Sequence, residues 1–122
     1  MKHLRFAALI IAILLIIGCS TAYKNLMANM PDLVSIADGV YRGYYDVSST
    51  PVNATVDVTV QNHRITEINI VKHMRSPVGK KAEKITDIII ERQRLDIDAI
   101  SGATASSKAI LKAVENALQN NL

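Results

Sequence analysis

Aromatic residues and cysteine are scarce in this chain. It has no tryptophan, one phenylalanine and one cysteine among its 122 residues. A core with so few large rings must be built mainly from aliphatic side chains, and a single cysteine excludes an internal disulfide. Hydrophobic residues nevertheless make up 49% and charged residues 20% of the chain. This balance is typical of a globular protein and excludes a disordered one.

The net positive charge is small beyond the N-terminus. The formal net charge is +3 at pH 7, and two of the basic residues, Lys2 and Arg5, stand at the extreme N-terminus. The rest of the chain has no basic stripe and no arginine cluster with interleaved aromatic rings, which are the signs of a nucleic-acid-binding surface. We therefore expect no nucleic-acid partner.

The N-terminal residues have the pattern of an export signal. A basic start is followed by an uninterrupted apolar run from Phe6 to Gly18. Hydrophobic regions of signal peptides span about 7–15 residues, whereas a membrane-spanning helix needs about 20. The length of the run therefore predicts a signal peptide or membrane-anchor helix over residues 1–18.

The end of this run indicates how the protein is held at the membrane. The sequence IIGC at Cys19 resembles a bacterial lipobox, in which the cysteine is lipidated and becomes the new N-terminus. We predict a lipoprotein, with an uncleaved anchor extending to about Tyr23 as the alternative. Either arrangement puts the remainder on the extracytoplasmic face of the cell membrane. Residues 19–37 are predicted to form a tether and residues 38–122 the folded domain.

Three segments of this domain alternate as β-strands do. Residues 54–60 place alanine and valine on one face and threonine and aspartate on the other, the pattern of a half-buried strand. Residues 39–47 and 65–73 are the other two candidates, and Asn62 in the turn between the later strands tolerates a positive φ. Strands so close in sequence pair most simply as an antiparallel meander.

The period then changes to that of helices. Residues 78–93 carry a 3-4 spaced apolar stripe, preceded by a capping Ser76 and by Pro77 at the first helical position. Residues 106–118 form the last helix, with its apolar residues on one face. The predicted fold is an α+β domain: a small antiparallel sheet of about three strands covered by two C-terminal helices, after an N-terminal signal or anchor helix.

The segment before the last helix, residues 98–107, is rich in small and hydroxyl-bearing residues. The hydroxyls belong to Ser101, Thr104, Ser106 and Ser107. The first turn of a helix has free N–H groups and a partial positive charge, which suits a phosphate group. Gly102 and Ala103 let a ligand approach the backbone closely. Thr104 offers a hydroxyl at the mouth of this site, and Asp98 is available to orient that hydroxyl or accept its proton.

Residues 98–104, DAISGAT, resemble the flavinylation motif of the FMN-binding domain family. The family pattern is Asp, a small residue, an aliphatic residue, Ser or Thr, and then Gly-Ala-Thr. The likeness extends over most of residues 38–118. It implies that FMN is joined to Thr104 by a phosphoester bond, with contacts to the phosphate from the remaining candidates. Those cofactor-binding candidates are Asp98, Ser101, Gly102, Ala103, Ser106 and Ser107.

The same resemblance implies partners. In the family a dedicated flavin transferase attaches the cofactor outside the cytoplasm, using FAD and magnesium. Members include flavin-carrying subunits of ion-pumping NADH-quinone and ferredoxin-NAD oxidoreductases. We therefore expect a flavin transferase, redox partner proteins and the membrane as the partners of this chain.

Other polar residues have simpler interpretations. Lys80, Lys81, Lys84 and Glu83 are predicted to form a solvated helix face. His63 and His73 lack the spacing of a zinc site; His63 suits a turn, and His73 either ends a strand or contacts the flavin. Asp96 is predicted to be a loop residue and not a second acid.

The sequence as a whole favours an exported, membrane-tethered flavoprotein that carries electrons and is not itself an enzyme. Two alternatives stay open. The domain could bind a flavin without a covalent bond and sense redox state, or it could be a structural lipoprotein in which SGATASS only starts a helix.

Overall fold

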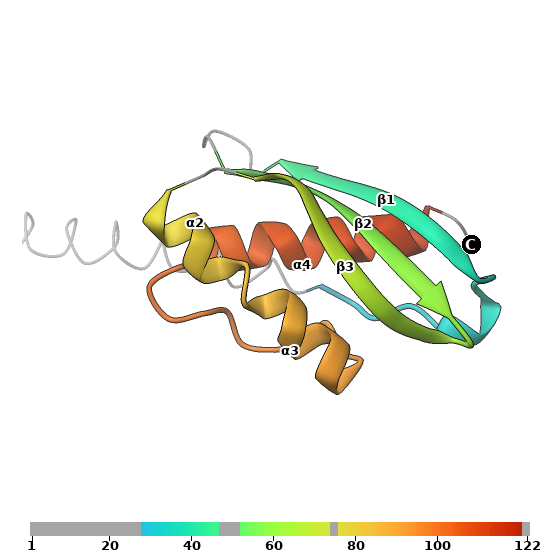
Figure 1. Ribbon diagram of the computed structural model, residues 1–122. Helices are drawn as coiled ribbons and strands as arrows, with labels where there is room; N and C mark the ends of the chain where they lie inside the picture. Colours follow the sequence, from blue (N-terminus) through green and yellow to red (C-terminus); the bar gives the residue numbers. More distant parts are fainter. Residues whose placement is uncertain (1–27, 47–51, 74–75, 121–122) are drawn as a thin grey trace, which may run out of the picture.

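A computed structural model describes residues 28–46, 52–73 and 76–120. These residues form a three-stranded antiparallel sheet with helices packed on one face (Figure 1). The predicted signal peptide, residues 1–18, and the lipidation site Cys19 lie outside the described residues. Within the described ranges, no helix is both long and apolar enough to cross a membrane.

The sheet is the predicted meander. Its strands β1 (Gly39–Asp46), β2 (Asn53–Gln61) and β3 (Arg64–His73) lie in the order β1-β2-β3. The alternation of β2 is confirmed, because Ala54, Val56, Val58 and Val60 are fully buried while the residues between them are half-buried. The two residues that join β2 to β3, Asn62 and His63, have φ values of 51° and 62°. A turn with two positive φ angles matches the twist of a tight hairpin.

The last helix, α4 (Thr104–Gln119), crosses β1 and β2 and supplies the second half of the core. Its backbone lies very close to β1 at Gly43. A Cβ atom at Gly43 would stand 1.9 Å from the carbonyl oxygen of Ala113 and 2.5 Å from the amide nitrogen of Ala117. Glycine on the strand and alanines on the helix therefore allow α4 to lie directly on the sheet.

The helix predicted over residues 78–93 is two helices, α2 (Pro77–Ala82) and α3 (Ile85–Arg92). The carbonyl oxygen of Glu83 accepts from both the amide and the hydroxyl of Thr86, at 3.2 and 2.9 Å. The hydrogen bond from the Thr86 amide spans three residues, whereas a bond in a regular α-helix spans four. The Thr86 hydroxyl competes with the backbone amides of the helix for the same carbonyl oxygen. The predicted Ser76 cap is confirmed, since its Oγ accepts from the Gly79 amide at 3.0 Å.

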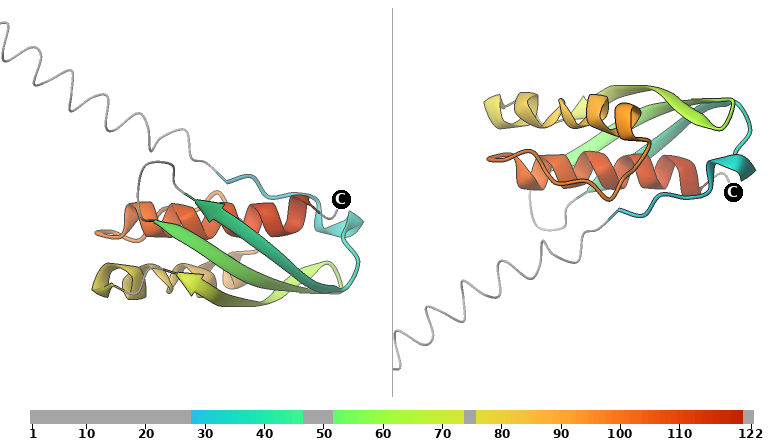
Figure 2. Two further views of the ribbon diagram at one scale, coloured as in Figure 1. Left: turned by 90° about the horizontal axis from the view of Figure 1, so that it is seen from above. Right: turned by 90° about the horizontal axis from the view of Figure 1, so that it is seen from below.

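Helix α3 is tied to the outer edge of β3 by one side chain. Gln93 ends α3 in the left-handed region at φ 53°. Its Oε1 accepts from the amide of Ile65 at 2.8 Å, and its Nε2 donates to the carbonyl of Ile65 at 2.7 Å. The amide group thus substitutes for a neighbouring strand. Figure 2 shows that α2 and α3 run beside α4 on the same face of the sheet.

The chain before β1 also contributes to the core. A 3-10 turn, η1 (Leu33–Ser35), is capped by Asp32, whose carboxylate accepts from the Val34 amide at 3.0 Å. Ala28 and Ile36 are 3% and 1% exposed and belong to the main hydrophobic cluster. Apolar residues N-terminal to the predicted boundary at residue 38 therefore pack with the domain.

Candidate functional site

The candidate site is the loop that leads into α4. The amide of Ala103 donates to the carbonyl of Ile100 at 2.9 Å and closes a tight turn over Ser101 and Gly102. Gly102 has a φ of 78°, the left-handed value that the third residue of a type II turn requires. Glycine is suited to this position because other residues are strained there.

Ser107 holds this loop against the helix. Its side chain is fully buried, and its Oγ accepts from the amide of Ile100 at 3.1 Å. Ser106 is also buried, with 6% of its surface exposed. The two serines therefore lie in the first turn of α4, and the hydrogen bond that Ser107 accepts from Ile100 holds the turn that carries Gly102.

The other candidates divide between surface and interior. Asp98, Ser101, Gly102 and Thr104 are exposed, whereas Ala103 is 2% exposed. Thr104 is the first residue of α4. Its hydroxyl and the Asp98 carboxylate, both described, share no hydrogen bond in this structure. The predicted contact of Asp98 with the hydroxyl therefore stays a prediction.

The N-terminus of α4 is not capped by a side chain. Its N-cap residue is Ala103, which offers no hydrogen-bonding group. Helix α2 and the turn η1 start differently, because Ser76 and Asp32 satisfy amides of their first turns. The amides at the start of α4 lack carbonyl partners within the helix, and the helix dipole makes this end partially positive. The arrangement suits a bound anion.

A lysine from α2 lies against the same loop. The Nζ atom of Lys81 is 3.5 Å from the point where a Cβ atom on Gly102 would stand. The sequence predicted a solvated helix face for this residue and its neighbours. Lys81 is exposed, as predicted, and it also lies beside this loop. Helix periodicity separates Lys81 from Lys80 by about 100°, but it gives no sign that a loop twenty residues later lies beside one of them.

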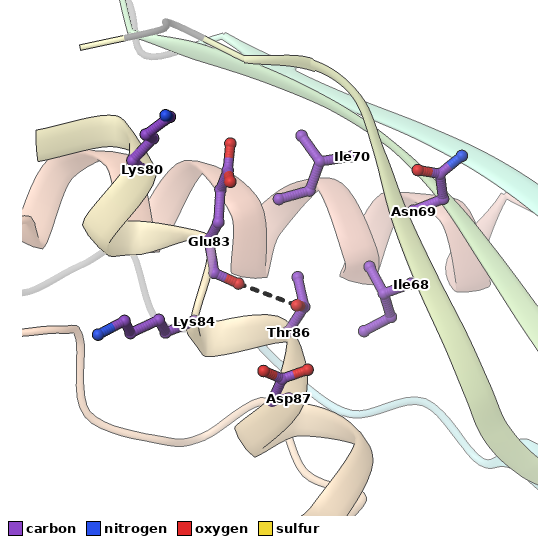
Figure 3. Close-up of a pocket in the computed structure, with 8 residues that line it drawn as sticks. All are labelled: Ile68, Asn69, Ile70, Lys80, Glu83, Lys84, Thr86 and Asp87. Carbon is purple, nitrogen blue, oxygen red and sulfur yellow. Dashed lines mark hydrogen bonds between the residues drawn. The ribbon is translucent and has the colours of Figure 1, made fainter. Parts of the chain in front are cut away.

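A groove opens on the other side of α2. It has a volume of about 450 Å³ and lies between β3 and the helices α2 and α3 (Figure 3). Ile68 and Ile70 form its apolar side, and the helices contribute polar side chains. Those polar residues are Lys80, Glu83, Lys84, Thr86 and Asp87. An apolar wall opposite a charged wall fits an amphipathic group better than a fully apolar one.

His73, at the end of β3, is partly enclosed. Its Nδ1 lies 3.4 Å from the carbonyl oxygen of Asn53, and its Nε2 is buried with no hydrogen-bond partner among the described residues. The ring lines a second cavity of about 370 Å³, which shares Ile70 and Glu83 with the groove. His63 stands at the opposite end of the strand, in the hairpin turn.

An exposed ion pair occupies the Asp96 carboxylate in the segment that enters the loop. Arg94 donates to the Asp96 carboxylate through its Nε at 2.8 Å and through a second, shorter bond from Nη2. The hydrogen bond from Arg94 lowers the pKa of the Asp96 carboxyl below its ordinary range. Asp96 is therefore ionised and engaged with its neighbour, as expected of a loop residue.

Comparisons with known proteins show the family of the domain that contains this loop. The family model of the FMN-binding domain matches residues 49–119, which include the loop and all of α4. An uncharacterized protein of Treponema pallidum is 35% identical over 81 residues, covering 63% of this chain and 22% of that protein. Urocanate reductase of Eggerthella lenta is 38% identical over 66 residues, covering 52% of this chain and 11% of the reductase. The chain thus spans less than a quarter of either relative.

Proposed function

Because the chain belongs to the FMN-binding domain family, we propose that it carries FMN covalently on Thr104 and transfers electrons between redox partners outside the cytoplasm. One observation supports this most directly. Thr104 is exposed as the first residue of a helix whose start no side chain caps. If the motif served only to begin a helix, a hydroxyl would be expected at the N-cap, where Ala103 stands instead.

The residues present fit a phosphate ester. Gly102, exposed at φ 78°, leaves the backbone open where a side chain would stand. The free amides and partial positive charge at the start of α4 favour the single negative charge of a phosphodiester on Thr104. When bound, the isoalloxazine ring supplies the oxidation and reduction chemistry, and the protein holds it in place.

The attachment step is a substitution at phosphorus without oxidation or reduction. The Oγ of Thr104 bonds to the riboflavin-side phosphorus of FAD while the pyrophosphate bond breaks and AMP leaves. The hydroxyl proton passes to a base, and the exposed carboxylate of Asp98 on the same loop is our candidate for accepting it or for orienting the hydroxyl. The magnesium-dependent flavin transferase supplies FAD and the remaining groups.

The proposal includes export and tethering to the membrane. Residues 1–18 act as the signal or anchor, and lipidated Cys19 holds the domain on the extracytoplasmic face. A covalent bond keeps the flavin with a protein that has left the cytoplasm, where free FMN would diffuse away. The match to urocanate reductase covers about a tenth of that enzyme. The role proposed for this chain is that of an electron carrier, which follows from its membership of the FMN-binding domain family.

Flavin attachment is tested by expressing the chain together with a flavin transferase. After denaturation the wild-type band is expected to fluoresce, and the tryptic peptide of residues 95–108 is expected to gain the mass of FMN less water. Thr104→Ala should abolish both signals and leave the free energy of unfolding nearly unchanged, because the side chain is exposed. Thr66→Ala, which removes an exposed threonine of β3, is the matched control.

Two results would contradict the proposal. Flavin that leaves the chain on denaturation would indicate a non-covalent binding module. Attachment in Thr104→Ala equal to that in the wild type would place the bond on another residue. The intact mass of the membrane-extracted protein tests lipidation of Cys19 in the same preparation.

Asp98 can be tested against its neighbour. Asp98→Ala is expected to slow attachment by roughly a hundredfold, within the range found for loss of a general base. Asp96→Ala is the control, since that carboxylate is engaged by Arg94 and should not affect the rate. Initial rates with purified transferase measure both variants, and equal rates for the two would remove Asp98 from the mechanism.

A further inference from the structure

Two positive groups meet at the candidate site. The Nζ of Lys81 lies 3.5 Å from where a Cβ on Gly102 would stand, and Gly102 is two residues before the start of α4. The helix start is itself partially positive. Like charges brought together raise the free energy of the folded chain unless an anion is bound between them.

No acidic residue in the described part of the chain neutralises Lys81. Its ammonium group has no hydrogen bond or ion pair with another described residue. Lys112, farther along α4, differs in this respect, because its Nζ donates to the Glu115 carboxylate at 2.8 Å. Glu83 lies two residues beyond Lys81 but lines the groove beside β3. The ammonium group of Lys81 is therefore available to an anion from outside the described chain.

We propose that Lys81 is a positioning residue that binds the flavin phosphate during its transfer to Thr104 and in the finished ester. This inference rests on the proposed function of Thr104. While the bond from Oγ to phosphorus forms and AMP leaves, the ammonium group offsets the negative charge on the phosphoryl oxygens. Afterwards it pairs with the single charge of the phosphodiester, opposite the amides at the start of α4.

The placement of Lys80 provides a matched control. It precedes Lys81 in α2 but lines the groove beside β3, as Figure 3 shows. Both lysines are exposed and both belong to the same short helix. Removing either charge changes the net charge of the protein by the same amount, and only Lys81 is beside the loop.

The test measures attachment by purified flavin transferase with FAD and magnesium. Lys81→Met is expected to lower the initial rate by roughly tenfold or more, the effect of losing one hydrogen bond to a charged group. Lys81→Arg should restore most of the rate, because it restores the charge. Lys80→Met should stay within about twofold of the wild type, as expected for an exposed charge away from the reacting atoms.

A second measurement separates contact with the phosphate from contact with the transferase. Protein loaded by long incubation and freed of the transferase is examined by ³¹P NMR. The ester resonance should move in Lys81→Met and return towards its wild-type position in Lys81→Arg, while Lys80→Met leaves it unchanged. If Lys81→Met slowed attachment but left the ³¹P resonance of the ester unmoved, Lys81 would act in docking of the transferase, and the proposal would be overturned.

The remaining outcomes distinguish this inference from the function on which it rests. A wild-type rate and resonance in Lys81→Met, with Thr104→Ala still unmodified, would overturn the role of Lys81 and leave the attachment site intact. Full attachment in Thr104→Ala would overturn both.

Discussion

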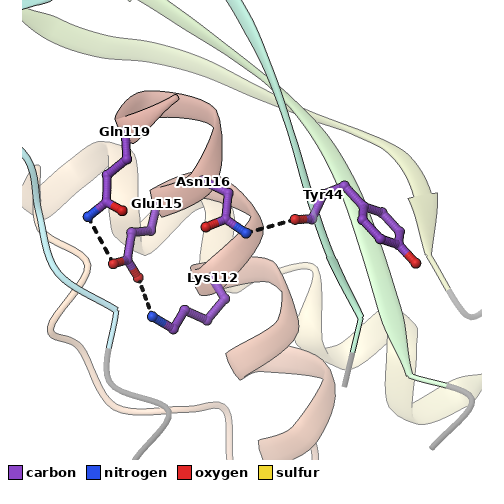
Figure 4. Close-up of polar contacts among 5 residues, drawn as sticks. All are labelled: Tyr44, Lys112, Glu115, Asn116 and Gln119. Carbon is purple, nitrogen blue, oxygen red and sulfur yellow. Dashed lines mark hydrogen bonds and ion pairs between the residues drawn. The ribbon is translucent and has the colours of Figure 1, made fainter. Parts of the chain in front are cut away.

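The two ends of α4 are held in different ways. Towards its C-terminal end, Asn116 donates to the carbonyl of Tyr44 on β1 at 2.8 Å (Figure 4). Glu115, only 4% exposed, accepts from Lys112 at 2.8 Å and from Gln119 at 3.0 Å. At the N-terminal end the cap makes no side-chain bond and Thr104 faces outward. Side-chain contacts hold the C-terminal end of the helix, whereas at the N-terminal end the Thr104 side chain stays exposed and no side chain caps the first-turn amides.

The largest expected effect comes from a substitution that disrupts the packing of α4 against the sheet. In Gly43→Ala the new methyl group would stand 1.9 Å from the carbonyl oxygen of Ala113, which is backbone and cannot swing aside. We expect the free energy of unfolding to fall by about 3 kcal/mol, at the upper end for overpacked cores. Urea unfolding of the purified domain measures the change.

Gly39→Ala is the matched control on the same strand. A Cβ there would meet only the Tyr41 side chain, at 3.6 Å, an ordinary contact distance. Its free energy of unfolding should stay close to that of the wild type. If the two variants proved equally stable, the close approach of α4 to β1 would be wrong, and with it the idea that this end anchors the helix.

The anchored end is also the part that the sequence predicts well. The alternation of β2 and the apolar face of α4 report burial directly, because each has a fixed period. The periodicity of residues 78–93 predicted one helix, since the apolar stripe passes through the break unchanged. At the break, the amide and the hydroxyl of Thr86 both donate to the carbonyl of Glu83, an arrangement that leaves no sign in the pattern of apolar residues.

At the N-terminal end of α4, the sequence identified the candidate residues of the loop but not where all of their side chains lie. Gly102 was expected to open the backbone to a ligand, and its positive φ agrees with that expectation. Ser107 was expected to face a phosphate, whereas its hydroxyl accepts a loop amide inside the fold. The position of Lys81 beside Gly102 was not predicted, because it depends on how α2 packs against α4. A local motif shows which reactive groups are present, whereas the residues that lie beside it from elsewhere in the chain depend on tertiary structure.

A substitution of Ser107, at the N-terminal end of α4, is expected to have a smaller effect on the free energy of unfolding. Ser107→Ala removes the acceptor of the Ile100 amide and leaves that partly buried N–H without a partner. The expected loss is about 1–3 kcal/mol in the free energy of unfolding. Ser101→Ala, in the exposed part of the same turn, should cost much less. Equal losses in urea unfolding would mean that the bond from Ser107 does not hold the loop.

The smallest expected effect lies on the outer face of the sheet, away from both ends of α4. Arg42 donates to the Asp57 carboxylate at 2.7 and 2.8 Å, and this hydrogen bonding lowers the pKa of Asp57. A lowered pKa in the folded state means that the pair stabilises the protein at neutral pH and loses this contribution as acid protonates the carboxylate.

Asp57→Asn should therefore be slightly less stable than the wild type at pH 7, and the difference should vanish as the pH falls through the pKa of Asp57 in the folded protein. The effect is small because the Arg42 side chain is 64% exposed and water screens the pair. Urea unfolding at a series of pH values measures it, with flavin attachment to Thr104 as the comparison. If the difference in the free energy of unfolding grew in acid, the ion pair would not stabilise the protein in the way proposed. If Asp57→Asn lost flavin attachment, the outer face of the sheet would be coupled to the loop before α4.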